Sequence, residues 1–386
     1  MRQSRVDNAS GDVPRHEEEG RGDNVSRRTF LLGTAGVAMS AVLAGCSSSS
    51  SGSHGGNGTQ TTVKELTGVS LLLDFLPNVD DVFLPVAQKY GYFADAGLKV
   101  SFTNPSVAEI NSIPELVGLG KYDFGIQSVP VGMFARSAGS PVISVAGFGK
   151  RSEGIISLPP NKVTGPSSLV GKTVATYNAA DYKAFMVSFM KSAGLSASQV
   201  NLVNTDFTAP IIASGKAQFG LGLRWGEFLD TEAEAKKTCN FLSFYEPDHY
   251  GIPQMNYLQI FTSESFASKN PDTVKAMLEA MARGYKKAIL LSSGELSPIM
   301  NTWASVGPNA TGSLTTNMQK FQAGRAFYFY GSNQDPNTAV YFQQPLDSLP
   351  AVATWLEQTG VSKSIGNLSD FATNKFITPA TLNPSV

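Results

Sequence analysis

The sequence predicts an α/β protein made of two similar lobes, and three observations lead to this fold class. After residue 64, short apolar runs typical of buried strands alternate with segments of helical periodicity. The string Gly120 to Gly125 recurs in similar form at Gly215 to Gly220, each time between a helical run and a short apolar run. Helical stretches dominate after residue 262. We therefore expect two crossings between the lobes, with the C-terminal part returning to pack on the first lobe.

Composition excludes several classes of function. Charged residues make up 16% of the chain, below the roughly 25% of an average globular domain, and 30 basic side chains face 31 acidic ones. This near-neutral balance lacks the excess of basic residues that is typical of nucleic-acid-binding proteins, so we expect no nucleic-acid partner. The 386 residues include three His and two Cys, too few for a His/Cys zinc site or a disulfide framework. We expect no metal and no cofactor.

The first 45 residues are typical of an export signal. Arg27 and Arg28 stand directly before an uncharged stretch rich in Gly and Ala, from Thr29 to Gly45. At about 17 residues, this stretch is marginal for a bilayer span, which needs ~20 apolar residues, but it suits the apolar region of a signal peptide. Paired arginines before such a region favour the twin-arginine type of signal. The alternative is two chance arginines before a buried helix.

A cysteine, Cys46, ends this segment in the string Leu43-Ala44-Gly45-Cys46, which resembles the bacterial lipoprotein box. The next 16 residues, SSSSSGSHGGNGTQTT, contain no apolar side chain and are typical of a flexible tether. We predict that residues 1–45 are removed, that Cys46 carries lipid, and that residues 46–63 form the tether. The protein would then be exported and lipid-anchored on the outer face of the cytoplasmic membrane. An incidental cysteine is the alternative.

The mature chain is expected to form its elements in the following order. Strands are predicted at 69–73, 98–102, 141–146, 171–176 and 257–261, and helices at 82–90, 184–193, 271–291 and 344–359. Gly91 and Gly194 close the first two helices. Pro85 falls in a first helical turn if Asp80 or Asp81 caps the helix. The glycine of each repeated string is expected to end a helix and to lead into a strand.

An ordered set of short motifs resembles the NMT1/THI5-like family of solute-binding proteins. The motifs are Asp74-Phe75-Leu76-Pro77-Asn78, Tyr90-Gly91-Tyr92-Phe93, Ala96-Gly97-Leu98-Lys99-Val100, Tyr122-Asp123-Phe124-Gly125-Ile126, Gly171-Lys172-Thr173-Val174, Trp225 to Glu227 and Gly251-Ile252-Pro253. The resemblance continues at Phe185 to Leu195, Val203-Asn204, Gly215-Lys216 and Trp355 to Pro379. Each motif is weak alone, but together they cover, in order, nearly all of the chain after the tether.

The resemblance implies a type II periplasmic-binding-protein fold, in which two α/β lobes clamp a small molecule at a two-crossing hinge. We expect lobe 1 to comprise residues 64–158 and 255–386, and lobe 2 to comprise residues 159–254. The family delivers its solute to an ABC permease and its ATPase. The protein would bind to the membrane through its lipid anchor and act as a monomer.

In the first lobe, five residues are candidates for ligand binding by this resemblance. Phe75 stands where pyrimidine-binding relatives place a stacking tryptophan, and Asn78 offers both a donor and an acceptor. Packing in the core and an Asx turn are their structural alternatives. Asp81 aligns where relatives often carry a histidine, and a helix cap is its other interpretation. Gln127 and Ser128 follow the repeated string, and Ser128 as N-cap would direct backbone N–H groups to the cleft.

In the second lobe, five more residues are candidates. Asn178 and Tyr182 follow the strand at 171–176, and Tyr182 could oppose Phe75. Relatives read close to W-N-W-E at the position of Arg224-Trp225-Gly226-Glu227, so Trp225 and Glu227 are expected to contact a flat ligand, although one residue of spacing differs. Arg224 leaves room for an anionic group on the ligand. A surface pair of Arg224 with Glu227 is the alternative.

The predicted function is a non-enzymatic binding component of an ABC importer for a small flat heterocycle, with a thiamine-precursor pyrimidine as the first candidate. Riboflavin or an aromatic or alkyl sulfonate is the alternative within this class. Eukaryotic family members instead make the thiamine pyrimidine from a histidine and Lys-bound pyridoxal phosphate, and carry a C-C-C-F-C segment. This chain lacks that segment and holds only Cys239 and His249 after its tether. A binding-protein fold used as an extracytoplasmic sensor is a third interpretation.

Overall fold

The computed structural model describes residues 65–386, apart from 246–248, 305–313, 329–334, 367 and 369. Residues Thr62–Val386 form one compact unit, and every element below belongs to it. The predicted export signal, Cys46 and the tether lie outside the described residues, so these stay predictions.

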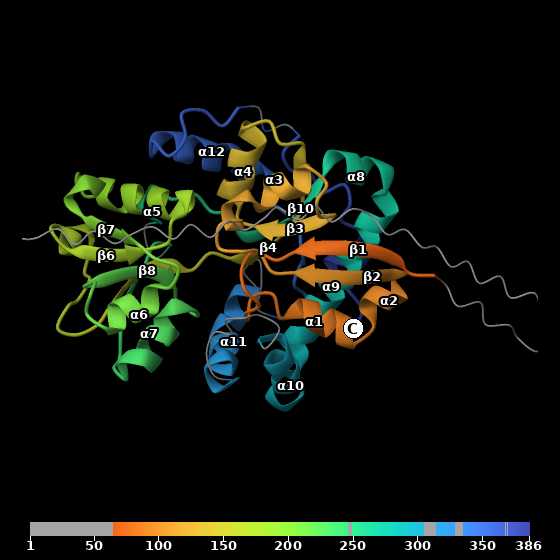
Figure 1. Cartoon of the computed structure of the whole chain (residues 1–386), viewed down its shortest axis with the longest axis horizontal. Coiled ribbons are helices and arrows are strands. Elements are labelled where there is room, and N and C mark those ends of the chain that lie inside the picture. Colours follow the sequence, from red (N-terminus) through yellow and green to blue (C-terminus); the bar gives the residue numbers. More distant parts are fainter. Residues whose placement is uncertain (1–64, 246–248, 305–313, 329–334, 367, 369) are drawn as a thin grey trace, which may run out of the picture. The chain divides into compact units, whose positions relative to one another are not determined.

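The first lobe is built on a five-stranded sheet with the order β2-β1-β3-β10-β4 (Figure 1). Its strands are β1 (Thr67–Leu72), β2 (Leu98–Thr103), β3 (Phe124–Gln127), β4 (Val142–Lys150) and β10 (Asn256–Ser263). The first three run parallel, and β10 is antiparallel to both β3 and β4. Val69 and Leu71 of β1 and Leu98 and Val100 of β2 are buried in the core of this lobe, whereas Lys99 and Ser101 of the edge strand β2 are exposed.

The second lobe repeats this plan in a sheet with the order β7-β6-β8-β5-β9. Its strands are β5 (Glu153–Ser157), β6 (Thr173–Thr176), β7 (Asn201–Asn204), β8 (Phe219–Leu223) and β9 (Asn240–Ser243). The central strands β3 and β8 follow the two copies of the repeated string, whose glycines Gly120 and Gly215 both adopt left-handed backbone angles after a helix. The sequence repeat therefore marks equivalent positions in the two lobes, as predicted.

Helices cover both sheets and match the predicted order. They are α1 (Phe83–Lys89), α2 (Tyr92–Asp95), α3 (Ile113–Gly118), α4 (Val129–Ser137), α5 (Ala180–Lys191), α6 (Thr208–Ala213), α7 (Glu227–Ala235), α8 (Glu264–Lys269), α9 (Pro271–Leu290), α10 (Ser293–Ala304), α11 (Leu314–Tyr328), α12 (Leu349–Gln358) and α13 (Pro379–Leu382). Five short 3₁₀ turns are described, at Ile110–Ser112, Pro166–Leu169, Ala197–Gln199, His249–Gly251 and Leu346–Ser348.

The boundary between the lobes lies earlier than predicted. The chain enters the second sheet at Glu153, where β5 pairs with β8 and β9, although the sequence placed this crossing at residues 158 and 159. The polar segment Lys150-Arg151-Ser152 separates the apolar runs of β4 and β5, and it was the signal for this crossing that the prediction overlooked. The second crossing occurs between β9 and β10.

The C-terminal part packs on more of the molecule than predicted. Helix α12 contacts α4 of the first lobe and α5 of the second (Figure 1). Trp355 of α12 donates from Nε1 to Ser188 Oγ at 2.6 Å, and its ring lies 5.4 Å from that of Phe185. The prediction placed the C-terminal part on the first lobe, and the structure adds a contact with the second lobe, because the apolar face of α12 also covers α5.

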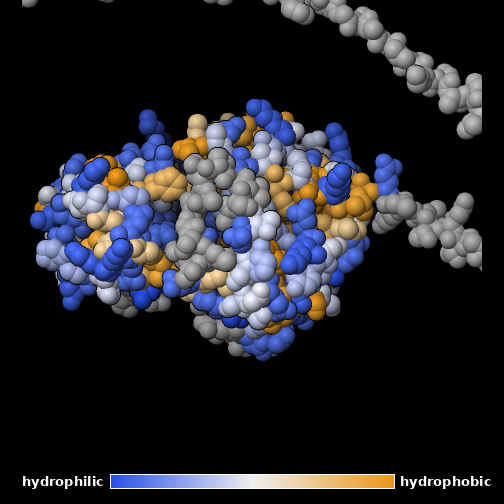
Figure 2. Space-filling model, turned by 60° about the horizontal axis from the view of Figure 1, so that its bottom comes forward, coloured by the Kyte–Doolittle hydropathy of each residue, from blue (hydrophilic) through white to orange (hydrophobic). Residues whose placement is uncertain are grey.

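The surface of the folded unit mixes polar and apolar side chains. Figure 2 shows small orange patches interspersed with blue over the face that it draws. Among the residues that the structure describes, none of the helices combines the length and the apolar character that crossing a membrane requires.

Candidate ligand-binding site

A cavity of about 470 Å³ lies where loops from both sheets meet the hinge. It is lined by segments that follow β1, β3, β6 and β8, by the start of β5 and β10, and by α11. The polar and aromatic side chains among its lining residues are Asp74, Phe75, Asn78, Asp80, Asn111, Gln127, Ser128, Arg151, Glu153, Tyr177, Asp181, Tyr182, Phe207, Thr208, Trp225, Glu227, Asp230, Glu234, Tyr257, Asn317 and Lys320. Such a volume suits a small organic ligand.

Aromatic rings from both lobes form part of the apolar wall of the cavity. Phe75 contacts Phe207 edge to face at 6.1 Å between ring centroids. Tyr182 contacts Tyr177 in the same manner at 5.1 Å. These two pairs come from both lobes, since Phe75 follows β1 and the others belong to the second lobe. The cavity can therefore present aromatic surface to a flat ring from both sides.

Trp225 forms a third aromatic contact of the cavity. Its ring meets that of Tyr257 edge to face at 6.0 Å, and it packs against the backbone of α11 at Gly324, where an added Cβ would approach the indole at 3.4 Å. Only 6% of Trp225 is exposed, and its Nε1 has no hydrogen-bond partner among the described residues. An indole N–H of this kind is available to a ligand or to water.

Glu227 is held in place by hydrogen bonds within the second lobe. Its Oε2 accepts from the backbone N–H of Leu223 at 2.7 Å, and its Oε1 accepts from the hydroxyl of Tyr177 at 2.7 Å. Gly222 permits this close approach, because a Cβ there would come within 2.5 Å of Glu227 Cβ. Burial, followed by the charge of Glu227, raises the pKa of Tyr177 well above its usual value, so Tyr177 stays a donor.

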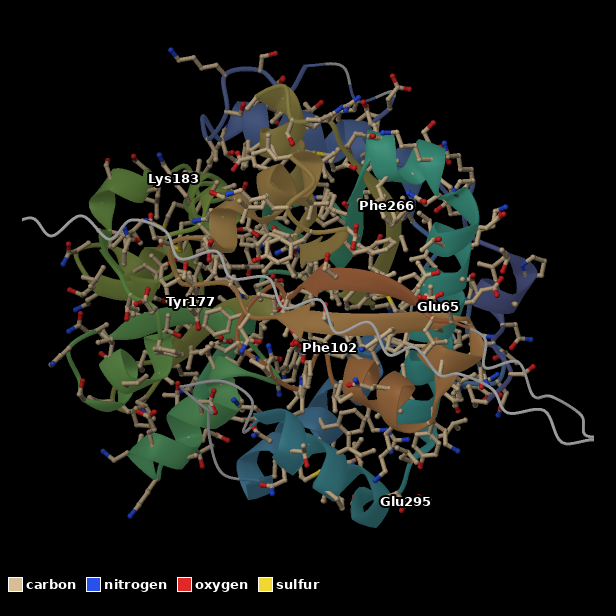
Figure 3. All side chains as sticks on the ribbon, turned by 45° about the vertical axis from the view of Figure 1, so that its right-hand side comes forward. Glu65, Phe102, Tyr177, Lys183, Phe266 and Glu295 are labelled. Atoms are coloured by element: carbon tan, nitrogen blue, oxygen red, sulfur yellow. The ribbon has the colours of Figure 1, made fainter. Side chains whose placement is uncertain are left out.

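Figure 3 shows how the loop after β6 contributes to this site. Tyr177 lies inside the molecule, whereas Lys183 of α5 is on its outer side. Helix α5 begins at Ala180, so Asp181 and Tyr182 occupy its first turn and face the cavity, while Lys183 is exposed. The strand-to-helix turn therefore decides which of these neighbouring side chains reaches the ligand site.

The hinge contributes a buried ion-pair network that sequence reasoning missed. Arg151 lies between β4 and β5 and bonds to Glu153 at 2.5 Å and to Asp181 at 3.2 Å. Burial alone would lower the pKa of Arg151, but the carboxylates of Glu153 and Asp181 raise it above its ordinary value. The guanidinium is thus permanently charged, and its charge is compensated inside the protein. The sequence signal for this network was a pair of opposite charges, Arg151 and Glu153, at the junction of two apolar strands.

Two further carboxyl groups, Asp74 and Asp80, were also missed as site residues. Both line the cavity and are more than nine-tenths buried. Burial, with the nearby Asp81, raises the pKa of Asp74 from 3.8 to about 8. Burial and then Asp74 raise the pKa of Asp80 well above its usual value, while a hydrogen bond from Tyr257 lowers it in part. Asp74 belongs to the motif Asp74-Phe75-Leu76-Pro77-Asn78, which was the available signal in the sequence.

The structure brings seven of the ten predicted ligand-binding residues to the cavity. These are Phe75, Asn78, Gln127, Ser128, Tyr182, Trp225 and Glu227. Ser128 is the N-cap of α4 with Pro130 in the first turn, as predicted, and 6% of it is exposed. Gln127 donates to the carbonyl of Ile110 and accepts from the N–H of Ser128, which orients this loop. Whether these residues touch a ligand stays a prediction.

Asp81 does not line the cavity. Its carboxylate accepts hydrogen bonds from Trp303 Nε1 at 2.6 Å and from the N–H of Asn78 at 3.2 Å. The alternative interpretation as a side-chain cap is also wrong, because α1 begins after Val82 without a side-chain cap. Asp81 instead holds the loop of Asn78 against α10, since a fully buried carboxylate needs donors.

Asn178 and Arg224 also lie outside the cavity lining. The Asn178 side chain is exposed, and only its carbonyl takes part in a contact between lobes, accepting from Asn111 Nδ2 at 3.1 Å. Arg224 is exposed, with its guanidinium 5.4 Å from the ring of Phe228 and 5.2 Å from that of Phe241. Arg224 and Trp225 both lie in the turn after β8, where Arg224 is exposed beside Phe228 and Phe241 while Trp225 is buried.

The cavity and the paired lobes define the periplasmic-binding-protein fold, which solved structures share. The alkanesulfonate-binding protein SsuA from Xanthomonas axonopodis pv. citri, bound to MOPS, aligns with a TM-score of 0.57 at 12% identity, covering 78% of this chain and 96% of its own. A family model described as NMT1/THI5 like matches residues 78–290, more than half of the chain. The protein therefore belongs to the NMT1/THI5-like family.

Two curated relatives illustrate the range of this family. A formylaminopyrimidine-binding protein of Halalkalibacterium halodurans is 27% identical over 234 residues, which is 59% of this chain and 68% of that protein. A 4-amino-5-hydroxymethyl-2-methylpyrimidine phosphate synthase, THI13 of Saccharomyces cerevisiae, is 25% identical over 227 residues, which is 56% of this chain and 65% of that protein.

Proposed function

We propose that this protein is the extracytoplasmic solute-binding component of an ABC importer and that it captures a small flat heterocycle of the thiamine-precursor pyrimidine class. The relative that binds a formylaminopyrimidine supports this solute class. The fold supports clamping of the solute between two lobes. The carrying observation is the fixed carboxylate of Glu227 among aromatic rings, because an aminopyrimidine presents N–H donors on a flat ring.

The charges of the cavity argue against an anionic solute such as a sulfonate. Its described lining includes two cations, Arg151 and Lys320, and both are paired with carboxylates of the protein. Four further acidic residues line the same space: Asp74, Asp80, Glu227 and Glu234. Arg224, the residue on which a sulfonate site would have depended, lies outside the lining. A neutral or cationic heterocycle therefore fits better.

Binding rather than catalysis is proposed, although synthases occur among the relatives. Cys239 is a buried thiol that packs beside Ile156 and Ile212, with its pKa raised by burial to about 11. It is absent from the described cavity lining, which also includes no histidine. Lys320, the lysine of that lining, is engaged by Asp230 at 2.6 Å. A visible absorption band from a Lys-bound cofactor in the purified protein would revive the enzymatic interpretation.

Export and lipid anchoring complete the proposed function. The segment with Arg27 and Arg28, the lipoprotein-like box at Cys46 and the tether occur in the order that an anchored exported protein requires. The tether would leave the folded unit free to approach a permease in the same membrane.

Calorimetry on the protein, after mild unfolding and refolding to remove any carried ligand, tests the solute class. We expect saturable binding of 4-amino-5-hydroxymethyl-2-methylpyrimidine and no binding of MOPS. Riboflavin serves as the flat but larger comparison. Binding of MOPS without binding of the pyrimidine would contradict the proposal.

A further inference from the structure

We propose that Asp74 and Asp80 form a cation-binding subsite in the first lobe, which holds a protonated amino group of the ligand while Glu227 contacts its ring. This inference rests on the proposed function and names a narrower ligand class, a flat heterocycle that carries a positively charged nitrogen. The subsite lies on the segment between β1 and α1.

The two carboxyl groups have acceptor capacity that the protein does not use. Asp74 is 8% exposed and Asp80 is 5% exposed, and one oxygen of each has no hydrogen-bond partner among the described residues. Buried acceptors without donors are costly, because they lose their hydrogen bonds to water on folding. A ligand that supplies N–H donors would satisfy them.

Nearby protein charges do not compensate these carboxyl groups. The ionisable side chains that act most strongly on them are acidic: Asp81 acts on Asp74, and Asp74 and then Glu227 act on Asp80. Asp81 uses one oxygen on Trp303, and Glu227 is engaged by Tyr177. The hydroxyls of Tyr257 and Tyr285 also face Asp80, and the pKa of each is well above its usual value, which leaves both neutral. The cavity's cations are committed to other carboxylates, as described above.

Two independent features beside these carboxyl groups also point to a ligand. Trp225 Nε1 is an unpartnered donor and Ser128 Oγ an unpartnered hydroxyl, each on a side chain that is 6% exposed and lines the same cavity. Trp225 and Asp80 share in addition a side chamber of about 10 Å³, which can hold at most about one water molecule. The indole N–H of Trp225 can donate to a ring nitrogen of a ligand, and the oxygens of Asp74 and Asp80 can accept from an amino group next to that nitrogen.

A nitrogen cation fits this subsite better than a metal ion. The described residues include no cluster of three or more His, Cys, Asp or Glu side chains arranged to hold a metal. The aromatic rings of Trp225 and Tyr257 next to Asp80 also favour an organic cation, since ring faces attract such groups.

A matched pair of pyrimidines tests the subsite by calorimetry. The probes are 4-amino-5-aminomethyl-2-methylpyrimidine, whose side group is protonated at neutral pH, and the 5-hydroxymethyl compound, which is uncharged. We expect the amine to bind at least ~10-fold more tightly, since a charge-assisted hydrogen bond to a buried carboxylate is among the strong ones. Asp80→Asn and Asp74→Asn should each remove most of this preference and leave the affinity for the alcohol within about threefold.

Asp95→Asn is the matched control, because Asp95 is an exposed carboxylate paired with Arg283 and lies outside the cavity. Thermal melts show whether each variant is folded, and Asp74→Asn provides a second test if Asp80→Asn unfolds. Equal binding of the two probes, or an unchanged preference in both folded variants, would overturn the subsite while leaving pyrimidine capture intact. Binding of neither pyrimidine would overturn both proposals.

Proton release gives a second readout. A cation in the subsite favours ionised carboxylates, so binding of the amine near pH 7 should release protons from Asp74 and Asp80. Its observed heat should then vary with the ionisation enthalpy of the buffer, and the heat for the alcohol should not. A buffer-independent heat for the amine would count against the subsite.

Discussion

Lys320 Nζ lies 2.6 Å from Asp230 Oδ2 and joins α11 to α7 beside the cavity. Helix α11 packs on β4 and α9 of the first lobe, whereas α7 belongs to the second, so this ion pair links the two lobes. Both side chains line the cavity. The hydrogen bond from Asn111 to the carbonyl of Asn178 provides another polar link between the lobes. The state described is therefore held together by polar contacts that a hinge motion would break.

Lys320→Met should weaken this link and let the ligand leave faster. Since the pair is partly exposed, we expect an effect of about 1 kcal/mol, or a severalfold higher dissociation rate. Stopped-flow fluorescence measures the rate, and solution scattering should show compaction when ligand binds the unmodified protein. Lys275→Met removes a more exposed ion pair, with Asp272 within α9, which does not join the lobes, and it is the control. An equal dissociation rate in both variants would show that the pair does not restrain the lobes.

Glu227→Gln should weaken pyrimidine binding about ten- to a hundredfold, since a buried charge-assisted hydrogen bond contributes roughly 1.5–3 kcal/mol. The structure adds an expectation that the sequence did not suggest. Each carboxylate oxygen of Glu227 accepts one hydrogen bond, from Leu223 and from Tyr177. In the Glu227→Gln variant the amide NH₂ would face one of these two donors, so the unliganded protein should also lose stability. Tyr177→Phe separates the two effects, because it leaves the carboxylate in place. Calorimetry and thermal melts measure both quantities.

Trp225→Phe should weaken binding more than Arg224→Ala does. The first change keeps a ring against Tyr257 but removes an unpartnered indole N–H of the cavity, whereas the second alters an exposed side chain that packs on Phe228. We expect a loss of about threefold to tenfold for Trp225→Phe, the effect of about one neutral hydrogen bond. Arg224→Ala should leave the affinity unchanged. A damaging Arg224→Ala would indicate an anionic ligand.

The unliganded protein should lose stability as the pH rises from about 4 to about 8. In this range folded Asp74, whose pKa is raised from 3.8 to about 8, keeps a proton that the unfolded chain has released. The stabilisation is therefore complete below about pH 4 and is lost as the pH passes through about 8. Asp80 acts in the same direction. Chemical denaturation at several pH values should show a smaller slope for Asp74→Asn, and an unchanged slope would argue against this titration.

Cys46→Ser should release the exported protein from the membrane. Mass spectrometry of the membrane fraction should find a lipid-modified Cys46 at the N-terminus of the unmodified protein. Arg27→Lys together with Arg28→Lys should prevent export by the twin-arginine route. An intact Met1 in the cytosol would contradict both expectations.

Local patterns were sufficient for most of the fold and for part of the site. Gly120 and Gly215 each end a helix in a left-handed backbone conformation, which depends mainly on the glycine itself. Their recurrence in similar strings therefore indicated two equivalent lobes. Phe75, Trp225 and Glu227 follow strand ends, and strand ends meet at one edge of a sheet, which made them predictable. Asp81 and Arg224 share these positions but point elsewhere, because Trp303 and Phe228 provide better partners.

The sequence by itself determined the α/β class, the duplication of the lobes and the aromatic and carboxylate character of the ligand site, because each depends on residues that are near one another in the chain. Only the tertiary structure decided how the charges are shared. Arg151 meets Asp181 across 30 residues, and Lys320 meets Asp230 across 90. These long-range pairs neutralise Arg151 and Lys320, so neither cation compensates Asp74 or Asp80. Electrostatic compensation depends on distance and burial rather than on order along the chain.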